Sequence, residues 1–394
     1  MLLFFAIILC VVMLAVFIQI SSGYGKLDSL DAVELQGKAD QPLVSIVIPA
    51  CNEAQSIEQS LRSLCHLDYS NVEIIVVDDR STDGTAQVVE SVRHDFPAVR
   101  LIRISELPEG WLGKPHALQR GAEEAGGEYL LFIDADVSLE KTTISRAVRA
   151  MEERTLDHLT LIFKNSSPGL LLNALIADIG AGLFFLIKPW KAKIAKSRYF
   201  MGVGAFNLVR APVYQSIGEH RKIKLQVVDD VYLGKLIKQN GFCQECMLAE
   251  SLVTLPWYRS VPEMISGLMK NVYAFFHYRP GYVFLGVLAI SVMTVVPMAG
   301  AIFAQGSAKF FFIMTVLIRV GGTGGGMIRI GLSPASIIFL LITPFISLFI
   351  ILKALFQVQL AGGVTWRGSF YRLDKLREAD WVLSGLFWPL IRKK

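Results

Sequence analysis

The chain has 394 residues, of which 53% are hydrophobic and only 19% are charged. Soluble domains are more polar than this, so we expect part of the chain to lie in a membrane. The net charge of +5 is small for this length, and the Lys and Arg residues are scattered, which argues against nucleic-acid binding. Five Cys residues are too few for a disulfide scaffold, and we interpret the lone CxxC at Cys243 and Cys246 as two unpaired thiols.

Residues 1–20 contain no charged side chain and are long enough to cross the hydrocarbon layer, which predicts an N-terminal transmembrane anchor. A cleaved signal peptide, with Ser21-Ser22-Gly23 as its cleavage site, is the alternative. Its apolar core would be unusually long, and no basic region precedes it. Lys26 and Lys38 follow the span, and this basic bias predicts that the next domain is cytoplasmic.

A C-terminal transmembrane region is expected over residues 281–360, with clear spans at 281–303 and 336–356. Between them, residues 310–330 are apolar but contain Arg319, Arg329 and a glycine-rich run, which are costly in lipid. Spanning, re-entrant and flat placements are open. If the basic tail at 361–394 is cytoplasmic, an even number of spans follows the soluble part, which favours the flat or re-entrant placement.

Residues 169–190 form a further apolar stretch that contains Asp178 and ends in Lys188-Pro189-Trp190. The charge of Asp178 argues against a span. We expect an amphipathic helix in the membrane interface, with an ordinary buried core helix as the alternative.

An α/β pattern occupies the segment after Pro42, where short β-branched runs alternate with stretches of helical periodicity. We expect strands at 44–48, 72–77, 99–104 and 129–133, and helices at 54–65, 85–93 and 115–125. Successive strand-to-helix units imply a mostly parallel sheet whose ligand site lies at the carboxyl ends of its strands.

Carboxylates follow three of these strands: Glu53, the pair Asp78-Asp79, and Asp134 with Asp136. The dinucleotide and P-loop fingerprints are both missing from the sequence. Carboxylates that converge at neutral pH need a counter-charge, and a divalent cation bound to a diphosphate would supply it.

Five motifs occur along the chain in the order Pro49–Glu53, Val77–Thr85, Trp111–Leu118, Phe132–Asp136 and Val228–Gly234. In this order, over residues 42–273, they resemble the family 2 glycosyltransferases of the GT-A fold. The C-terminal spans and the segment 364–371 resemble a membrane-bound branch that includes carotenoid-acid and hopanoid-associated glycosyltransferases.

The resemblance implies roles for individual residues. Asp230 would be the catalytic base, with Asp229 as its rival, and Asp136 would ligate Mn²⁺ or Mg²⁺ together with Asp134. Lys270 lies where polysaccharide synthases of the family carry a QxxRW motif, and it would offer a positive charge to the diphosphate. The expected donor-binding residues are Ala50, Glu53, Asp79, Lys114, Asp134 and Lys270.

The sequence therefore predicts a multi-pass protein of the cell membrane with a cytoplasmic catalytic domain. We expect an inverting glycosyltransferase that moves one sugar from a nucleotide-sugar donor, most simply a UDP-sugar, to a lipid or isoprenoid acceptor. A processive polysaccharide synthase is one alternative, although the missing QxxRW motif counts against it. A non-catalytic membrane scaffold that binds nucleotide sugars is the other.

Overall fold

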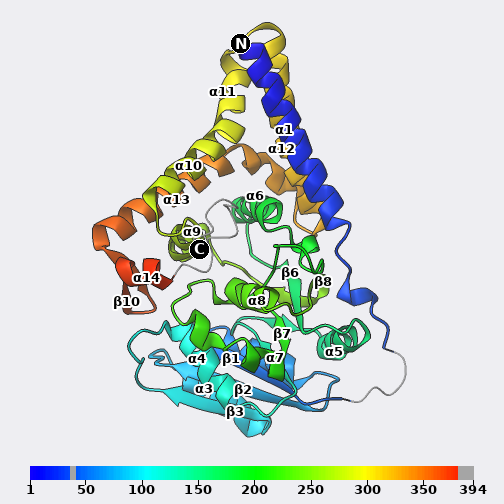
Figure 1. Cartoon of the computed structure of the whole chain (residues 1–394), viewed down its shortest axis with the longest axis vertical. Coiled ribbons are helices and arrows are strands. Elements are labelled where there is room, and N and C mark those ends of the chain that lie inside the picture. The colour runs from blue at the N-terminus through cyan, green and yellow to red at the C-terminus, as the bar shows by residue number, and fades with distance from the viewer. Residues whose placement is uncertain (36–40, 380–394) are drawn as a thin grey trace. The chain divides into compact units, whose positions relative to one another are not determined.

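The computed structural model describes residues 1–35 and 41–379, which divide into two compact units (Figure 1). A helical unit contains residues 1–26, 167–188 and 257–378, and an α/β unit contains residues 27–166 and 189–256. The chain thus passes between the units at several points. The predicted basic tail falls partly on residues 380–394, outside the described residues.

The α/β unit is built on an eight-stranded sheet in the order β3-β2-β1-β4-β7-β6-β8-β5. Neighbouring strands from β3 to β4 are parallel, as are β6 and β8, whereas β7 is antiparallel to both its neighbours and β5 to β8. The predicted mostly parallel sheet is confirmed. The strands are β1 (Val44–Ala50), β2 (Val72–Asp79), β3 (Val99–Ile104), β4 (Tyr129–Phe132), β5 (Ser138–Leu139), β6 (His158–Asn165), β7 (Asn207–Arg210) and β8 (Gln244–Leu255).

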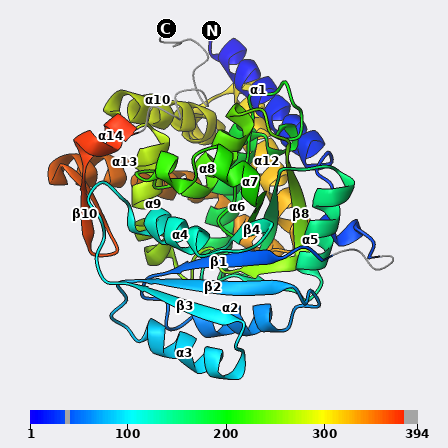
Figure 2. The ribbon, with the colours of Figure 1, turned by 60° about the horizontal axis from the view of Figure 1, so that its bottom comes forward.

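Helices cover both faces of the parallel strands, which explains why β1 and β2 read as continuous Val and Ile runs. In Figure 2, α2 and α3 lie on one side of β1–β3 and α4 lies on the other. The helices of this unit are α2 (Ile57–Cys65), α3 (Thr85–Asp95), α4 (Gly113–Glu123), α5 (Thr143–Glu153), α7 (Ala211–Ser216) and α8 (Asp229–Gln239).

Helix α2 begins at Ile57, three residues later than the sequence predicts, because the loop after β1 is hydrogen-bonded to the segment after β2. Asn52 has a positive φ of 58°, and its backbone N–H donates to Ser81 Oγ at 2.9 Å. The Glu53 N–H donates to Thr85 Oγ1 at 2.8 Å. These bonds fix the two loops to each other at the carboxyl edge of the sheet.

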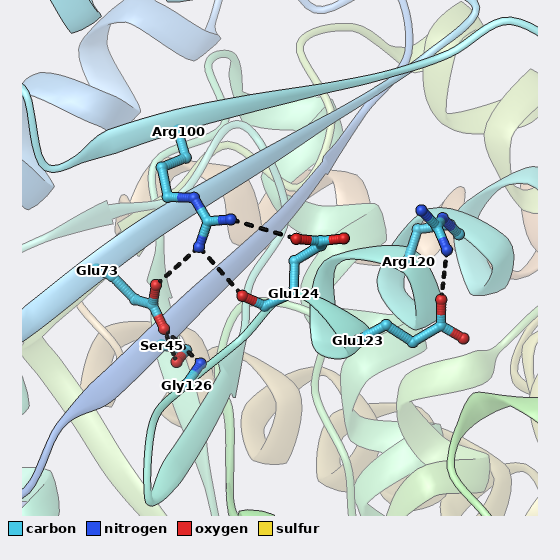
Figure 3. Close-up of polar contacts among 7 residues, drawn as sticks. All are labelled: Ser45, Glu73, Arg100, Arg120, Glu123, Glu124 and Gly126. Atoms are coloured by element: carbon cyan, nitrogen blue, oxygen red, sulfur yellow. Dashed lines mark hydrogen bonds and ion pairs between the residues drawn. The ribbon is translucent and has the colours of Figure 1, made fainter.

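At the opposite, amino-terminal edge, the Glu73 carboxylate ties three strands together (Figure 3). Its Oε1 accepts from Ser45 Oγ at 2.6 Å and from the Gly126 backbone N–H at 2.7 Å. Its Oε2 accepts from Arg100 Nη1 at 3.1 Å. Ser45, Glu73 and Arg100 lie near the starts of β1, β2 and β3, so this contact holds the parallel strands at the edge away from the acidic motifs.

The helical unit contains most of the apolar helices that the sequence predicts. Among the described residues, five segments are long and apolar enough to cross a membrane: 2–24, 170–191, 280–303, 306–329 and 343–361. The elements of the unit are α1 (Leu2–Tyr24), α6 (Leu170–Ile187), α9 (Val261–Phe275), α10 (Pro280–Ile290), α11 (Val296–Phe303), α12 (Gly306–Arg329), α13 (Thr343–Ala361), β9 (Gly363–Trp366), β10 (Ser369–Arg372) and α14 (Leu373–Ala379).

The glycine-rich segment forms one unbroken helix, α12, that runs beside α1 in the same direction (Figure 1). Leu9 packs in a cluster with Phe312, and the Arg329 guanidinium lies 4.3 Å from the Tyr24 ring. A side chain on Gly322 would collide with Phe17, so glycine allows the close approach. The sequence favours a flat or re-entrant placement of this segment, and an unbroken helix of 24 residues does not fit the re-entrant one. Whether the helix spans the membrane or lies flat stays a prediction.

A buried ion pair joins α6 to α12 inside this apolar unit. Arg319 Nη2 lies 2.6 Å from Asp178 Oδ2, and Arg319 Nη1 donates to the Leu340 carbonyl at 2.8 Å. Thr343 Oγ1 also donates to Asp178 Oδ2, at 2.7 Å. In Figure 1, α6 is viewed nearly along its axis while α1 and α12 extend across the picture, so α6 crosses these helices. Asp178 and Arg319, whose charges argue against membrane spans when each helix is considered alone, therefore neutralise each other.

Replacing Glu73 by Ala should lower the free energy of unfolding by about 1–3 kcal/mol, because the buried Ser45 hydroxyl and the exposed Gly126 N–H lose a charged acceptor. Glu90→Ala is the matched control, since Glu90 is exposed and pairs with Arg93 at 3.3 Å. Urea unfolding of the full chain in detergent measures both variants. Equal midpoints for the two would show that the Glu73 contact contributes nothing.

Arg319→Met should destabilise the helical unit by about 3–5 kcal/mol, because it leaves the Asp178 carboxylate buried without its cation. The double variant Asp178→Leu/Arg319→Met should recover most of that loss, since no charge is then buried. Thermal unfolding in detergent tests the pair. Strictly additive effects of the two substitutions would contradict the assignment.

Candidate active site

The first turn of α4 brings a lysine to the carboxyl edge of the sheet. Lys114 Nζ lies 2.6 Å from Asp134 Oδ1 and 3.7 Å from Asp229 Oδ1. A side chain on the preceding Gly113 would collide with the Asp79 carboxylate, so glycine lets the helix start close to the end of β2. The sequence predicts Lys114 at the site, and the structure places it among these carboxylates.

A glycine loop between α6 and β7 connects Asp134 to Asp230. The Asp134 backbone N–H donates to the Gly204 carbonyl at 2.9 Å, and the Gly204 N–H donates to Asp230 Oδ2 at 2.7 Å. A Cβ at position 204 would lie 2.5 Å from Asp134 Oδ2, and one at Gly202 would collide with the Asp230 carbonyl. Only glycines fit between the two acidic motifs.

Asp229 and Asp230 are the first two residues of α8, where the positive end of the helix dipole favours carboxylates. Asp229 is buried, with 2% of its surface exposed, whereas Asp230 is half-buried. Both line a small pocket whose other walls are Lys114, Leu118, Phe132, Ile133, Asp134, Gly204, Asn207, His220 and Leu233. Asp230 is therefore the more accessible of the two carboxylates.

Burial and mutual repulsion set the charges in this pocket. Burial raises the pKa values of Asp229 and Asp230 above the ordinary value, and the Lys114 ammonium opposes the rise. Burial would lower the pKa of Lys114, but the charges of Asp134, Asp229 and Asp230 outweigh it and raise that pKa. Lys114 therefore stays cationic, and it keeps the cluster from accumulating negative charge.

The second carboxylate after β4, Asp136, lies in the field of other acids. Burial and the charges of Asp134 and Glu53 raise the pKa of Asp136 to about 7. Among the described residues, no group of three or more His, Cys, Asp or Glu side chains could hold a metal without help. Asp134 and Asp136 supply hard oxygen donors that suit Mg²⁺ or Mn²⁺ when substrate phosphates and water complete the shell. The residues present thus fit a cation that binds with a phosphorylated substrate.

The other predicted donor residues lie at neighbouring strand ends. Ala50 is the last residue of β1 and is buried, and Glu53 Oε2 accepts from Ser56 Oγ at 2.9 Å. Asp79 is buried at the end of β2, where Arg80 Nε and Nη2 donate to its two oxygens at 2.7 and 2.9 Å. Any ligand of Asp79 must share the carboxylate with this guanidinium or displace it.

Lys270 belongs to the helical unit, unlike the rest of the predicted site. Its ammonium lies 3.5 Å from the ring centroid of Trp366, in a cation–π contact between α9 and β9.

Sequence reasoning misses three parts of the site. Gly202 and Gly204 have a readable signal, since a Gly-x-Gly just before a strand indicates a close backbone approach. Arg80 follows Asp79 in the sequence, but nothing in the sequence indicates that its guanidinium binds both oxygens of that carboxylate. His220 lines the pocket, hydrogen-bonds with Tyr214, and has its pKa lowered to about 3 by burial and by the Lys114 charge. It is a neutral wall residue.

Comparisons with known proteins find similar glycosyltransferases. Residues 45–200 match the family model described as "Glycosyl transferase family 2". The chain is 35% identical over 105 residues to YdaM, a probable glycosyltransferase of Bacillus subtilis. This alignment covers 26% of this chain and 25% of YdaM. It is 33% identical over 124 residues to the poly(ribitol-phosphate) beta-N-acetylglucosaminyltransferase TarS of Staphylococcus aureus, which covers 30% of this chain and 21% of TarS.

A third relative is the GalNAc(5)-diNAcBac-PP-undecaprenol beta-1,3-glucosyltransferase of Campylobacter jejuni, 28% identical over 28% of this chain and 35% of that protein. Among solved structures, the mannosyltransferase PcManGT of Pyrobaculum calidifontis, in complex with GDP-Man and Mn²⁺, aligns over 91% of this chain and 99% of its own with a TM-score of 0.48 and 16% identity. This chain spans only about a quarter of the length of YdaM and TarS. The family model confirms the motif resemblance over residues 45–200, the part of the chain that it matches.

Proposed function

We propose that this protein is a membrane-bound inverting glycosyltransferase that moves one sugar from a nucleotide-sugar donor to a lipid or isoprenoid acceptor. The observation that carries the proposal is the convergence of Asp134, Asp229, Asp230 and Lys114 on one pocket at the carboxyl edge of the sheet. Such a charge arrangement suits a substrate that brings both a diphosphate and a cation.

In the proposed reaction, the acceptor hydroxyl oxygen forms a bond to the anomeric carbon while the bond to the diphosphate oxygen breaks. The hydroxyl proton passes to the Asp230 carboxylate, and the nucleoside diphosphate leaves with the bonding electrons. Burial raises the pKa of Asp230, which makes its carboxylate a stronger proton acceptor. The Gly204 N–H orients the carboxylate through Oδ2. Asp229 is the weaker candidate because it is nearly inaccessible.

The donor side would use the strand ends described above. Ala50, Glu53 and Asp79 would line the nucleoside pocket, with Arg80 as a further polar group beside Asp79. Asp136 and Asp134 would hold Mn²⁺ or Mg²⁺, which when bound neutralises the leaving diphosphate. Lys114 would contact the same diphosphate. That Lys270, a residue of the helical unit, offers a positive charge to the diphosphate stays a prediction.

The lipid acceptor is supported by the helical unit. Five apolar helices and the short connections between the units would keep the α/β unit at a membrane surface, with the catalytic domain in the cytoplasm. The name of the Campylobacter relative includes an undecaprenol-linked saccharide, which is an acceptor of this chemical class. The carotenoid-acid and hopanoid-associated branch remains our prediction for the acceptor type.

A processive polysaccharide synthase is the second candidate, because a further relative, 32% identical over 25% of this chain, is a poly-beta-1,6-N-acetyl-D-glucosamine synthase of Staphylococcus epidermidis. The two candidates differ in product. Incubation of the full chain in detergent with Mn²⁺, lipid extract and a panel of nucleotide sugars should give singly glycosylated lipid by mass spectrometry. Long polymer would favour the synthase, and binding without turnover would favour the scaffold.

In the same assay, Asp230→Asn should lower turnover by about 10²–10⁴-fold, because the amide cannot accept the proton. Binding of nucleoside diphosphate should change little. Asp95→Asn is the control for loss of one exposed carboxylate elsewhere in the α/β unit. If Asp230→Asn retained turnover while Asp229→Asn abolished it, the base would be Asp229.

A further inference from the structure

The Lys114 ammonium lies on one of the two carboxylates that would hold the cation. Its Nζ is 2.6 Å from Asp134 Oδ1, a charge-assisted contact, and 3.7 Å from the buried Asp229 Oδ1. The Lys114 side chain is only 23% exposed, so this contact is only partly screened by water.

The surrounding backbone positions both partners of this contact. Leu112, which precedes α4, donates its N–H to the Lys224 carbonyl at 2.8 Å, so the start of α4 is anchored. A Cβ at Gly204 would lie 2.5 Å from Asp134 Oδ2 and 3.4 Å from Lys114 Nζ. The glycine loop therefore closes over the ion pair and leaves the carboxylate little freedom to turn away from Lys114.

We propose that Lys114 is an exchangeable internal cation that makes metal binding depend on the donor. Without donor, the ammonium occupies Asp134 and repels a divalent cation from the acidic cluster. A donor diphosphate offers Lys114 a more highly charged partner, and the lysine side chain is long and flexible enough to move to it. Asp134 is then released to ligate the metal with Asp136. This inference rests on the proposed function and adds an order of binding to it.

The coupling can be measured without sugar transfer, by titrating the full chain in detergent with Mn²⁺ and following the electron paramagnetic resonance signal of free Mn²⁺. For the wild type, UDP or GDP should tighten Mn²⁺ binding by about 5–150-fold, the usual range of coupling between two ligands. Lys114→Met should bind Mn²⁺ at least about fivefold more tightly than wild type in the absence of nucleotide, and it should lose most of the nucleotide effect.

Matched variants locate the effect. Lys114→Arg keeps the charge and should keep the weak nucleotide-free binding. Lys141→Met removes one charge from an exposed position in the same unit and should leave Mn²⁺ binding unchanged. Adding Asp136→Ala to Lys114→Met should abolish the gain. Lys114→Gln provides a second neutral variant, and thermal unfolding verifies that each variant is folded.

Mn²⁺ binding by Lys114→Met that is no tighter than wild type would overturn the inference, as would a gain that survives Asp136→Ala. Failure of the proposed function is a separate result. If neutral variants bind Mn²⁺ more tightly but no nucleotide sugar is turned over, the inference stands and the function falls. If turnover is observed while Mn²⁺ binding is unaffected by Lys114, the reverse holds.

Discussion

The α/β unit depends on one electrostatic constraint: three carboxylates converge on a pocket that contains a single ammonium. Asp134, Asp229 and Asp230 come from segments almost 100 residues apart, and Lys114 is 2.6 Å from the first of them. Without the ammonium, the three carboxylates would repel one another, and some of them would bind protons. Two local features place the ammonium among these carboxylates. Helix α4 begins at Gly113, directly before Lys114, and the glycine loop lies between Asp134 and Asp230. The same excess of negative charge would favour a cation at this site.

The helical unit also contains charged side chains away from water, but there the charges are balanced. Arg319 and Asp178 are charges in an apolar environment, but here one cation meets one anion, and Thr343 and the Leu340 carbonyl add hydrogen bonds to the pair. A charge-balanced pair of this kind needs no external ligand and joins helices. The pocket around Lys114 has an excess of carboxylates, and it is therefore the better place for a ligand.

The parts of this structure that the sequence predicts are those governed by local rules. The strands at 44–50, 72–79 and 99–104 follow from β-branched runs, and their acidic ends meet because parallel strands share one carboxyl edge. The parts that it does not predict depend on contacts distant in the chain. The Gly-x-Gly pattern at Gly204 indicates a close backbone approach, but it does not predict that Asp134 and Asp230 are the groups beside it. Arg319 reads as a barrier to a span until Asp178, 141 residues away, is placed beside it.

We propose that the carboxylate cluster receives a diphosphate and a cation together. The most direct measurement is an experimental structure of the full chain with Mn²⁺ and UDP bound. We expect Mn²⁺ to lie on Asp136 and Asp134, the diphosphate to lie against it, and Lys114 Nζ to contact a phosphate oxygen. A nucleotide bound elsewhere, or bound here with the contact between Lys114 and Asp134 intact and no metal on Asp136, would contradict it.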